Sequence, residues 1–358
     1  MARDTLHHLQ PLTDHDGMSR RLAVLACKQA VRKTLETRLR EQFHAEPGRP
    51  MEQLPGYRAW SSLNRAAQDR MWSLLAEQID RDYARIEQQA WRHTRDPRGS
   101  LELGAAQIPA YQQQSCIHGQ PGGYMLDRPQ AGAAGGDLAA GILYEAGGNL
   151  YALGQGIGRK DSKAQRLIEH LGEVYPDLQP RRILELGCSA GGQSTDYPDA
   201  FPAAEIWAID LSPGMLRYAH ARAETLGAPV HFRQADAADT RFPDEHFDLV
   251  VSHNLFHEVA AEHMPAIMLE CHRVLKPGGV VVHQDVPIQR ARLDEWMQAL
   301  SAWQKDHNDE PFWLDFTDAD LPAMLVAAGF APESVHAEYI KALDGPIPWY
   351  LARAQKPA

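Results

Sequence analysis

The spacing of apolar residues divides the chain into two parts with different periodicities. From about residue 19 to residue 90, apolar side chains recur every three or four positions, which predicts amphipathic helices. A break at residues 46–50 ends the first helical run, and a second run covers about residues 57–91. We expect the first run to bury one face, formed by Leu22, Leu25, Ala26 and Ala30. Its basic residues are then expected on a solvated face: Arg21, Lys28, Arg32 and Lys33.

The pattern changes twice after this helical part. Residues 95–150 look irregular and are rich in glycine, which predicts turns and connections with a short helix near Leu138–Tyr144. After about residue 160, short apolar runs alternate with helical segments. The expected strands are Arg182–Leu186, Glu205–Asp210, Val230–Gln234, Phe247–Ser252, Gly279–Val286, Ser334–Lys341 and Trp349–Ala354. The expected helices are Ser162–Val174, one after Gly191, Pro213–Leu226, Met264–Leu275 and Asp318–Ala328.

This alternation decides the predicted fold class and domain organisation. Strands that alternate with helices are typical of a parallel sheet covered by helices on both faces. We therefore predict an α/β protein with a Rossmann-like, mostly parallel sheet, whose last two strands form an antiparallel hairpin at the edge. Residues 156–358 are assigned to this domain, and residues 1–155 to a mainly helical cap that binds substrate.

Composition narrows the classes of partner. The 358 residues carry a net charge of −11, which argues against broad contact with nucleic acid or an anionic membrane surface. The four cysteines form no CxxC pair, so a disulfide framework is not expected. The polar N-terminus does not resemble a signal peptide, and no apolar run reaches the roughly 18–20 residues of a membrane span. We expect a soluble cytoplasmic protein with a small-molecule substrate; a homodimer is left open.

A glycine loop follows the first predicted strand of the second part. Residues 183–194 read ILELGCSAGGQS, in which Gly187 and Gly191 let the backbone approach a ligand closely. Ser189 stands where a dinucleotide-binding enzyme usually has its second glycine, which fits poorly with a bound pyrophosphate. Glu185 would also repel a pyrophosphate but suits an ammonium group. The loop therefore predicts a cofactor without a phosphate cradle.

Two further carboxylates end the next two strands. Asp210 lies at the tip of the second strand, where a carboxylate can accept both hydroxyl protons of a ribose. Asp236 follows the third strand, where an acidic side chain can accept from the exocyclic amine of adenine. Together with Glu185 these residues predict sites for an amine, a ribose and an adenine.

These motifs, in this order, resemble the class I S-adenosylmethionine (SAM) methyltransferases over about Leu167–Gln355. The matching segments are ELGCSAGG, WAIDLSPGMLRYA, QADAADTRFPDEHFDLVVSHNLFHEV, ECHRVLKPGGVVVHQDV and AMLVAAGF. The resemblance implies SAM as co-substrate, with Ser189 as a common variant of the family's glycine. It implies that Gly187 and Gly191 line the methionine part and that Asp210 holds the ribose. The other implied contacts are Leu211 and Met215 on the adenine, Asp236 and Ala237 at its amine, and Asn254 and Leu255 near the sulfonium.

Candidate catalytic residues lie at the mouth of this pocket. Methyl transfer needs a nucleophile aligned with the methyl–sulfur bond, and a base only if the acceptor is protonated. His257 and Glu258 are candidates for a general base or a substrate anchor, although His257 equally suits a packing role. His283, Gln284 and Asp285 are second candidates, for which a structural role at the sheet edge is favoured.

Tyrosines that precede the second part form another candidate group. Tyr144 and Tyr151 are nearest to the cofactor domain, ahead of Tyr111 and Tyr124. Their rings could stabilise a sulfonium by cation–π contact, or they could simply pack in the core.

Three alternatives to methyl transfer on a small molecule stay open at this point. The amine of SAM could attack its own γ-carbon, as in azetidine-2-carboxylate synthases, with release of methylthioadenosine. The chain could be an inactive SAM-binding protein. Nucleic-acid methylation is weaker, because the charge is acidic and no NPPY-type motif follows the fourth strand. The scattered histidines and cysteines show no spacing of a metal site, so no metal is expected.

Overall fold

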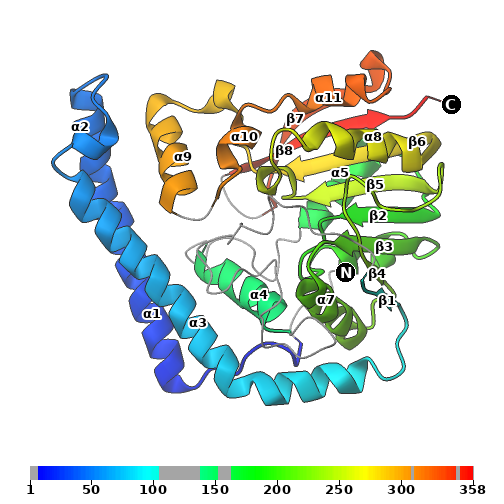
Figure 1. The fold of residues 1–358 in the computed structure, drawn as a ribbon, viewed down its shortest axis with the longest axis horizontal. Helices are drawn as coiled ribbons and strands as arrows, with labels where there is room; N and C mark the ends of the chain where they lie inside the picture. Colours follow the sequence, from blue (N-terminus) through cyan, green and yellow to red (C-terminus); the bar gives the residue numbers. More distant parts are fainter. Residues whose placement is uncertain (1–6, 105–137, 152–162, 308–309, 344–346, 358) are drawn as a thin grey trace.

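The second part of the chain folds around one mixed sheet. The computed structural model describes residues 7–104, 138–151, 163–307, 310–343 and 347–357. In these ranges the sheet has the order β1-β4-β3-β2-β5-β6-β8-β7 (Figure 1). Strands β1 to β6 pair in parallel, and β8 runs antiparallel to both β6 and β7. The strands are β1 (Leu101–Glu102), β2 (Arg182–Leu186), β3 (Glu205–Asp210), β4 (His231–Gln234), β5 (Phe247–His253), β6 (Leu275–Asp285), β7 (His336–Lys341) and β8 (Pro348–Gln355).

Helices cover both faces of this sheet. Successive residues of β2 face opposite sides, so Ile183 joins one apolar core and Leu184 the other. The core around Ile183 includes α5 (Lys163–Val174) and α7 (Pro213–Leu226). The core around Leu184 includes α8 (Met264–Val274) and α11 (Leu321–Ala327). The predicted Rossmann-like α/β fold with an antiparallel edge hairpin is confirmed.

The N-terminal part is helical, as predicted, and forms a long arm beside the sheet. Helices α1 and α3 run side by side, and α4 lies between α3 and α7 (Figure 1). The far end of the arm packs against α9 through Trp60, Trp296 and Trp303. No helix in the described ranges is long and apolar enough to cross a membrane. The elements are α1 (His15–Ala30), a π-helix (Val31–Glu36), α2 (Thr37–Ala45), α3 (Tyr57–His93), α4 (Ala139–Tyr151) and α9 (Glu295–His307).

The buried face predicted for α1 is wrong. Leu22 is 58% exposed, and Ala26 and Ala30 are exposed as well. Lys28, expected on the solvated face, is buried and donates a hydrogen bond from Nζ to Gln68 Oε1 at 2.9 Å. Burial lowers the pKa of Lys28 to about 8. The long stem of Lys28 lies in the α1–α3 contact, which therefore uses polar side chains that an apolar pattern does not reveal.

Other differences concern elements between the predicted strands. The helix expected after Gly191 is reduced to a 3₁₀ turn, Ser194–Asp196, and to α6 (Tyr197–Ala200). Helix α9 and the following α10 (Trp313–Thr317) were not predicted. Neither was β1, which joins the sheet from the N-terminal part.

Candidate active site

The residues of the predicted cofactor site meet at one edge of the sheet. The carboxyl ends of β2, β3, β4 and β5 lie at this edge because these strands are parallel. The strand order reverses between β2 and β5, and ligands of open α/β sheets bind in the crevice outside such a switch point. The glycine loop leaves β2 here, with positive φ angles of +65° at Gly187, +48° at Ser189 and +71° at Gly191.

Asp210, at the end of β3, holds this loop in place. Its Oδ2 accepts from the backbone N–H of Ser189, and its Oδ1 from that of Ser212, both at 2.9 Å. Burial raises the pKa of Asp210, and these backbone hydrogen bonds oppose the rise. Because a carboxylate oxygen can accept more than one hydrogen bond, Asp210 retains acceptor capacity for a pair of ligand hydroxyls.

The other two carboxylates end the strands on either side of β3. Glu185 is buried near the end of β2 and accepts a hydrogen bond from the Ser194 hydroxyl. Asp236 is half-buried after β4, and its Oδ1 accepts from Ala238 N at 2.8 Å. Three acidic side chains therefore lie at the carboxyl ends of adjacent strands, in the region where the amine, ribose and adenine sites were predicted. This donor set suits SAM, which carries an ammonium and a ribose but no phosphate.

The remaining predicted contacts surround this edge. A Cβ on Gly187 would lie 2.7 Å from Leu255 Cδ1, so the loop packs against Leu255, and the φ of +65° favours glycine there. Asn254 follows β5 with a φ of +57°, and its N–H donates to Gln284 O at 2.8 Å. Met215 is fully buried in the first turn of α7, and Leu211 is half-buried.

Tyr144 reaches the site from α4. Burial raises its pKa to about 12, a hydrogen bond with Ser189 opposes the rise, and the charges of Glu258, Asp210 and Glu185 add to it. These interactions bring Tyr144 together with the glycine loop and the crevice carboxylates. The side chain of Tyr151 and the whole of Tyr111 and Tyr124 lie outside the described residues.

His257 lies in a 3₁₀ turn after β5, Phe256–Glu258, and is held by a carboxylate of β6. Its Nδ1 lies 2.5 Å from Asp285 Oδ1, while Asp285 Oδ2 accepts from Phe256 N at 2.8 Å. Burial lowers the pKa of His257, but the charges of Asp285, Glu258 and Glu310 raise it more, to about 9. The imidazole is therefore protonated at neutral pH.

Glu310 lies beside His257 and Glu258, although the sequence pattern did not predict it there. It is completely buried, and a ligand atom of each of His257, Glu258 and Glu310 lies within 4.8 Å of the others. Nothing in the spacing of the chain indicated this set, because Glu310 follows α9, a helix that was not predicted.

The second group of candidates, His283, Gln284 and Asp285, does not share a single role. His283 and Gln284 are buried within β6, where His283 Nδ1 bonds Ser252 Oγ and Gln284 Oε1 bonds His253 Nδ1, each at 2.9 Å. Burial lowers the pKa of His283 to about 3. These contacts agree with a structural role, whereas Asp285 reaches the site through His257.

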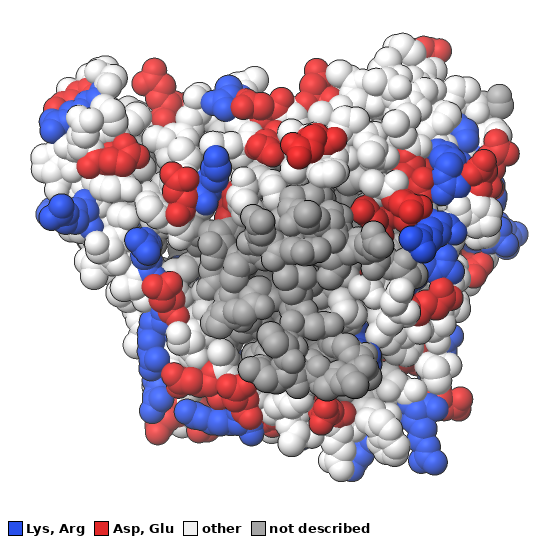
Figure 2. Space-filling view, viewed as in Figure 1, with Lys and Arg blue, Asp and Glu red and all other residues white. Residues whose placement is uncertain are grey.

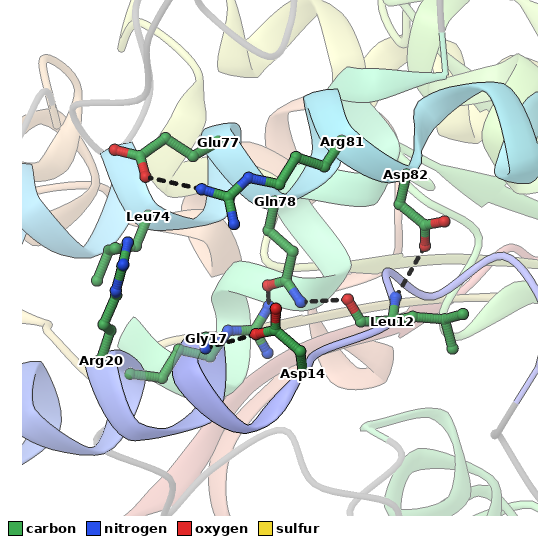
Figure 3. A pocket seen from close by; sticks show the side chains of 10 residues that line it. Leu12, Asp14, Gly17, Arg20, Leu74, Glu77, Gln78, Arg81 and Asp82 are labelled. Atoms are coloured by element: carbon green, nitrogen blue, oxygen red, sulfur yellow. Dashed lines mark hydrogen bonds and ion pairs between the residues drawn. The ribbon is translucent and has the colours of Figure 1, made fainter.

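A separate cavity of about 250 Å³ lies between α1 and α3 (Figure 3). Several of its polar side chains already interact with one another or with the backbone. Asp82 Oδ2 accepts from Leu12 N at 2.8 Å, and Gln78 Nε2 donates to Leu12 O at 2.6 Å. The cavity belongs to the contact between these two helices and shares no residue with the crevice.

Comparison with known proteins agrees with this geometry. Residues 183–279 match the methyltransferase domain family. A malonyl-[acyl-carrier protein] O-methyltransferase of Pseudescherichia vulneris is 31% identical over 194 residues, which are 49% of this chain and 72% of that protein. A probable phthiotriol/phenolphthiotriol dimycocerosates methyltransferase 2 of Mycobacterium ulcerans (strain Agy99) is 32% identical over 133 residues, 37% of this chain and 50% of that protein.

A solved structure was also similar. The SAM complex of phosphoethanolamine N-methyltransferase 2 from Haemonchus contortus has 19% identity and a TM-score of 0.42, over 54% of this chain and 52% of that one. The chain spans only about half the length of the first two curated relatives that it matches.

Proposed function

We propose that this chain, which belongs to the class I SAM-dependent methyltransferase family, transfers a methyl group from SAM to a small-molecule acceptor. SAM is the co-substrate. The observation that carries the proposal is the placement of Glu185, Asp210 and Asp236 at the carboxyl ends of three adjacent parallel strands. When bound, SAM supplies an electrophilic methyl group on a sulfonium.

Within this proposal, different residues of the chain bind different parts of SAM. Asp210 accepts the ribose hydroxyls, Asp236 and Ala237 read the adenine amine, and Glu185 faces the methionine ammonium. Leu211 and Met215 pack on the adenine. Gly187, Ser189 and Gly191 shape the loop along the methionine part, and Asn254 and Leu255 lie beside the sulfonium. The Tyr144 ring closes the crevice from α4, where its negative face favours the positive sulfur.

The chemistry of the acceptor depends on His257 and Glu258. A histidine with a pKa of about 9 is a weak candidate for a base at neutral pH, because nearly all of it is protonated. We therefore assign His257 as a hydrogen-bond donor that anchors the acceptor, and Glu258 as the group that takes the acceptor proton. Glu258 Oε1 lies 3.6 Å from His257 Nε2, so the two side chains can contact the same acceptor atom.

The acceptor atom is proposed to be oxygen. The relative from Pseudescherichia vulneris is an O-methyltransferase by name, and so is a fatty-acid O-methyltransferase of Mycolicibacterium smegmatis with 31% identity over 138 residues. Charge agrees with a small acceptor rather than a nucleic acid. Figure 2 shows Lys and Arg interleaved with Asp and Glu over the described residues of one face, without a broad basic patch among them.

The decisive experiment identifies the product formed from SAM. The protein is incubated with SAM alone and with SAM plus hydroxyl- and carboxyl-bearing acceptors, and the adenosine product is identified by mass spectrometry. S-adenosylhomocysteine that appears only with an acceptor supports methyl transfer. Methylthioadenosine formed from SAM alone would instead support the cyclisation alternative, and binding without turnover would support an inactive SAM-binding protein.

A further inference from the structure

A half-buried carboxylate on α4, that of Glu145, joins this helix to α7 and to the segment at His7. Glu145 Oε1 lies 3.0 Å from Arg222 Nε of α7, and Glu145 Oε2 lies 3.0 Å from His7 Nε2. The Tyr218 hydroxyl donates to the same carboxylate. Burial would raise the pKa of Glu145, but Arg222, His7 and Tyr218 lower it to about 2. Glu145 is therefore ionised at neutral pH.

The same guanidinium also binds the glycine loop. Arg222 is only 3% exposed, and its Nη1 donates to Gly191 O at 3.0 Å and to Thr195 Oγ1 at 2.9 Å. Gly191 is the second glycine of the loop that leaves β2. The N–H groups of a planar guanidinium point in fixed directions. When Glu145 orients the Arg222 guanidinium, it therefore also fixes where Arg222 binds the Gly191 carbonyl.

Helix α4 is thus linked to the glycine loop in two ways. Neighbouring residues of an α-helix point about 100° apart, because a turn takes 3.6 residues. Tyr144 meets the loop at Ser189, and Glu145 meets it through Arg222. The helix itself packs tightly, since a Cβ on Gly141 would lie 2.3 Å from Tyr218 Cβ. The loop is therefore held on both sides of Ala190, at Ser189 by Tyr144 of α4 and at Gly191 by Arg222 of α7, which Glu145 of α4 binds.

We propose that Glu145 and Arg222 are positioning residues, which hold the Gly191 end of the glycine loop in the shape that binds the methionine part of SAM. The inference rests on the proposed function of the crevice as a SAM site. Through this pair the docking of α4 and the binding of SAM favour one another, and by linkage each must strengthen the other to the same extent.

The chain contains a matched control elsewhere. Glu338 on β7 is also bracketed by a histidine and an arginine: His170 Nε2 lies at 3.1 Å and Arg353 Nε at 2.9 Å from its Oε1. Arg353 Nη1 donates in turn to Tyr175 OH at 3.1 Å. This cluster has the same four residue types as the first. It lies at the β7–β8 edge of the sheet, whereas the glycine loop leaves β2 in the middle of the strand order.

The test compares Glu145→Gln and Arg222→Lys with Glu338→Gln. The affinities for SAM and S-adenosylhomocysteine are measured by calorimetry, and the thermal midpoints are measured without ligand. We expect the first two variants to bind both ligands about ten- to a hundredfold more weakly, as for the loss of a hydrogen bond between charged groups. Glu338→Gln should lower the midpoint but leave both affinities within about twofold, on the same reasoning. Tyr218→Phe, which removes one hydrogen bond to Glu145, gives a milder variant if the others do not fold.

Hydrogen exchange supplies a readout that a purely structural role would not move. In the wild type, SAM should slow exchange of the α4 amides, and Glu145→Gln should abolish this protection at saturating SAM. Unchanged affinity in Glu145→Gln and Arg222→Lys overturns the inference, as does an equal loss of affinity in Glu338→Gln. A wild type that does not bind SAM at all would refute the proposed function itself, which separates the two failures.

Discussion

Asp210 has two roles at the residue scale, because it fixes the loop backbone and is proposed to accept the ribose. We predict that Asp210→Asn weakens SAM binding about ten- to a hundredfold, since a hydrogen bond to a charged group contributes roughly 1.5–3 kcal/mol. Calorimetric titration with SAM measures this loss.

The control for this variant is Asp248→Asn. Asp248 Oδ2 also accepts two backbone N–H groups, those of Arg181 and Arg182 at 2.8 Å, but at the opposite, amino-terminal end of β2. It should reduce stability and leave the SAM affinity unchanged. Equal affinities in both variants would show that Asp210 does not contact the cofactor.

His257 makes the proposed reaction depend on pH. If the protonated imidazole anchors the acceptor, kcat/KM falls as pH rises through about 9, the pKa of His257. Asp285→Asn removes the nearest negative charge, so the pKa of His257 falls and the decline moves to lower pH. A kcat/KM profile from pH 6 to 10 tests both statements, and a rate that rises through about pH 9 would identify His257 as a base instead.

Protonation of His257 also changes the stability of the folded protein. A histidine whose pKa is raised from 6.5 to about 9 stabilises the folded protein most strongly below pH 6.5. This contribution is lost progressively as pH rises through about 9.

The grouping of the three carboxylates at one sheet edge was predictable for a physical reason. Glu185, Asp210 and Asp236 each lie near or just beyond the end of a strand, and the carboxyl ends of parallel strands must meet at one edge. Tyr144 was a candidate only because it lies near the domain in sequence. Glu310 and the raised pKa of His257 depend on packing between distant segments, which no local pattern encodes.

At the scale of elements, the docking of α4 depends on a small residue. Gly141→Ala would place a methyl group within 2.3 Å of Tyr218 Cβ, so α4 must shift. We predict a loss of about 1–3 kcal/mol in the free energy of unfolding, typical of overpacking, together with weaker SAM binding. Chemical denaturation and calorimetry measure the two effects.

Gly172→Ala is the matched substitution. Gly172 lies in α5, and a Cβ there would meet nothing within 4 Å. Because alanine restricts the unfolded chain and suits a helix, this variant should gain about 0.4–1 kcal/mol. Identical behaviour of the two variants would contradict the tight α4–α7 contact.

The elements themselves were predictable to different degrees. Strands β2, β3 and β5 are rich in buried apolar residues and were located almost to the residue. The face of α1 was misjudged because its contact with α3 uses Lys28 and Gln68. Strand β1 has only two residues and exists through pairing with β4, so its own sequence carries no strand signal.

At the scale of the whole molecule, the apolar cores do not respect the proposed boundary near residue 155. Met71 and Trp72 of α3 share a core with Met215 and Tyr218 of α7. Trp60 and Trp303 pack against each other at the other end of the arm, with ring centroids 4.8 Å apart and an interplanar angle of 54°. We predict one cooperative thermal transition in scanning calorimetry; two resolved transitions would show that the helical part unfolds by itself.

Strand β1 has a consequence for self-association. The N-terminal part supplies the outermost strand beside β4, where Phe232 N donates to Ser100 O at 2.8 Å and Arg233 Nε lies 2.6 Å from Glu102 Oε2. Uncovered strand edges recruit other chains, and short, charged edge strands prevent this. Because β1 is synthesised before β4, the protecting strand is already present on the nascent chain when β4 emerges. We therefore expect this segment of the N-terminal part to shield the edge of β4 from pairing with other chains, independently of any role in binding substrate.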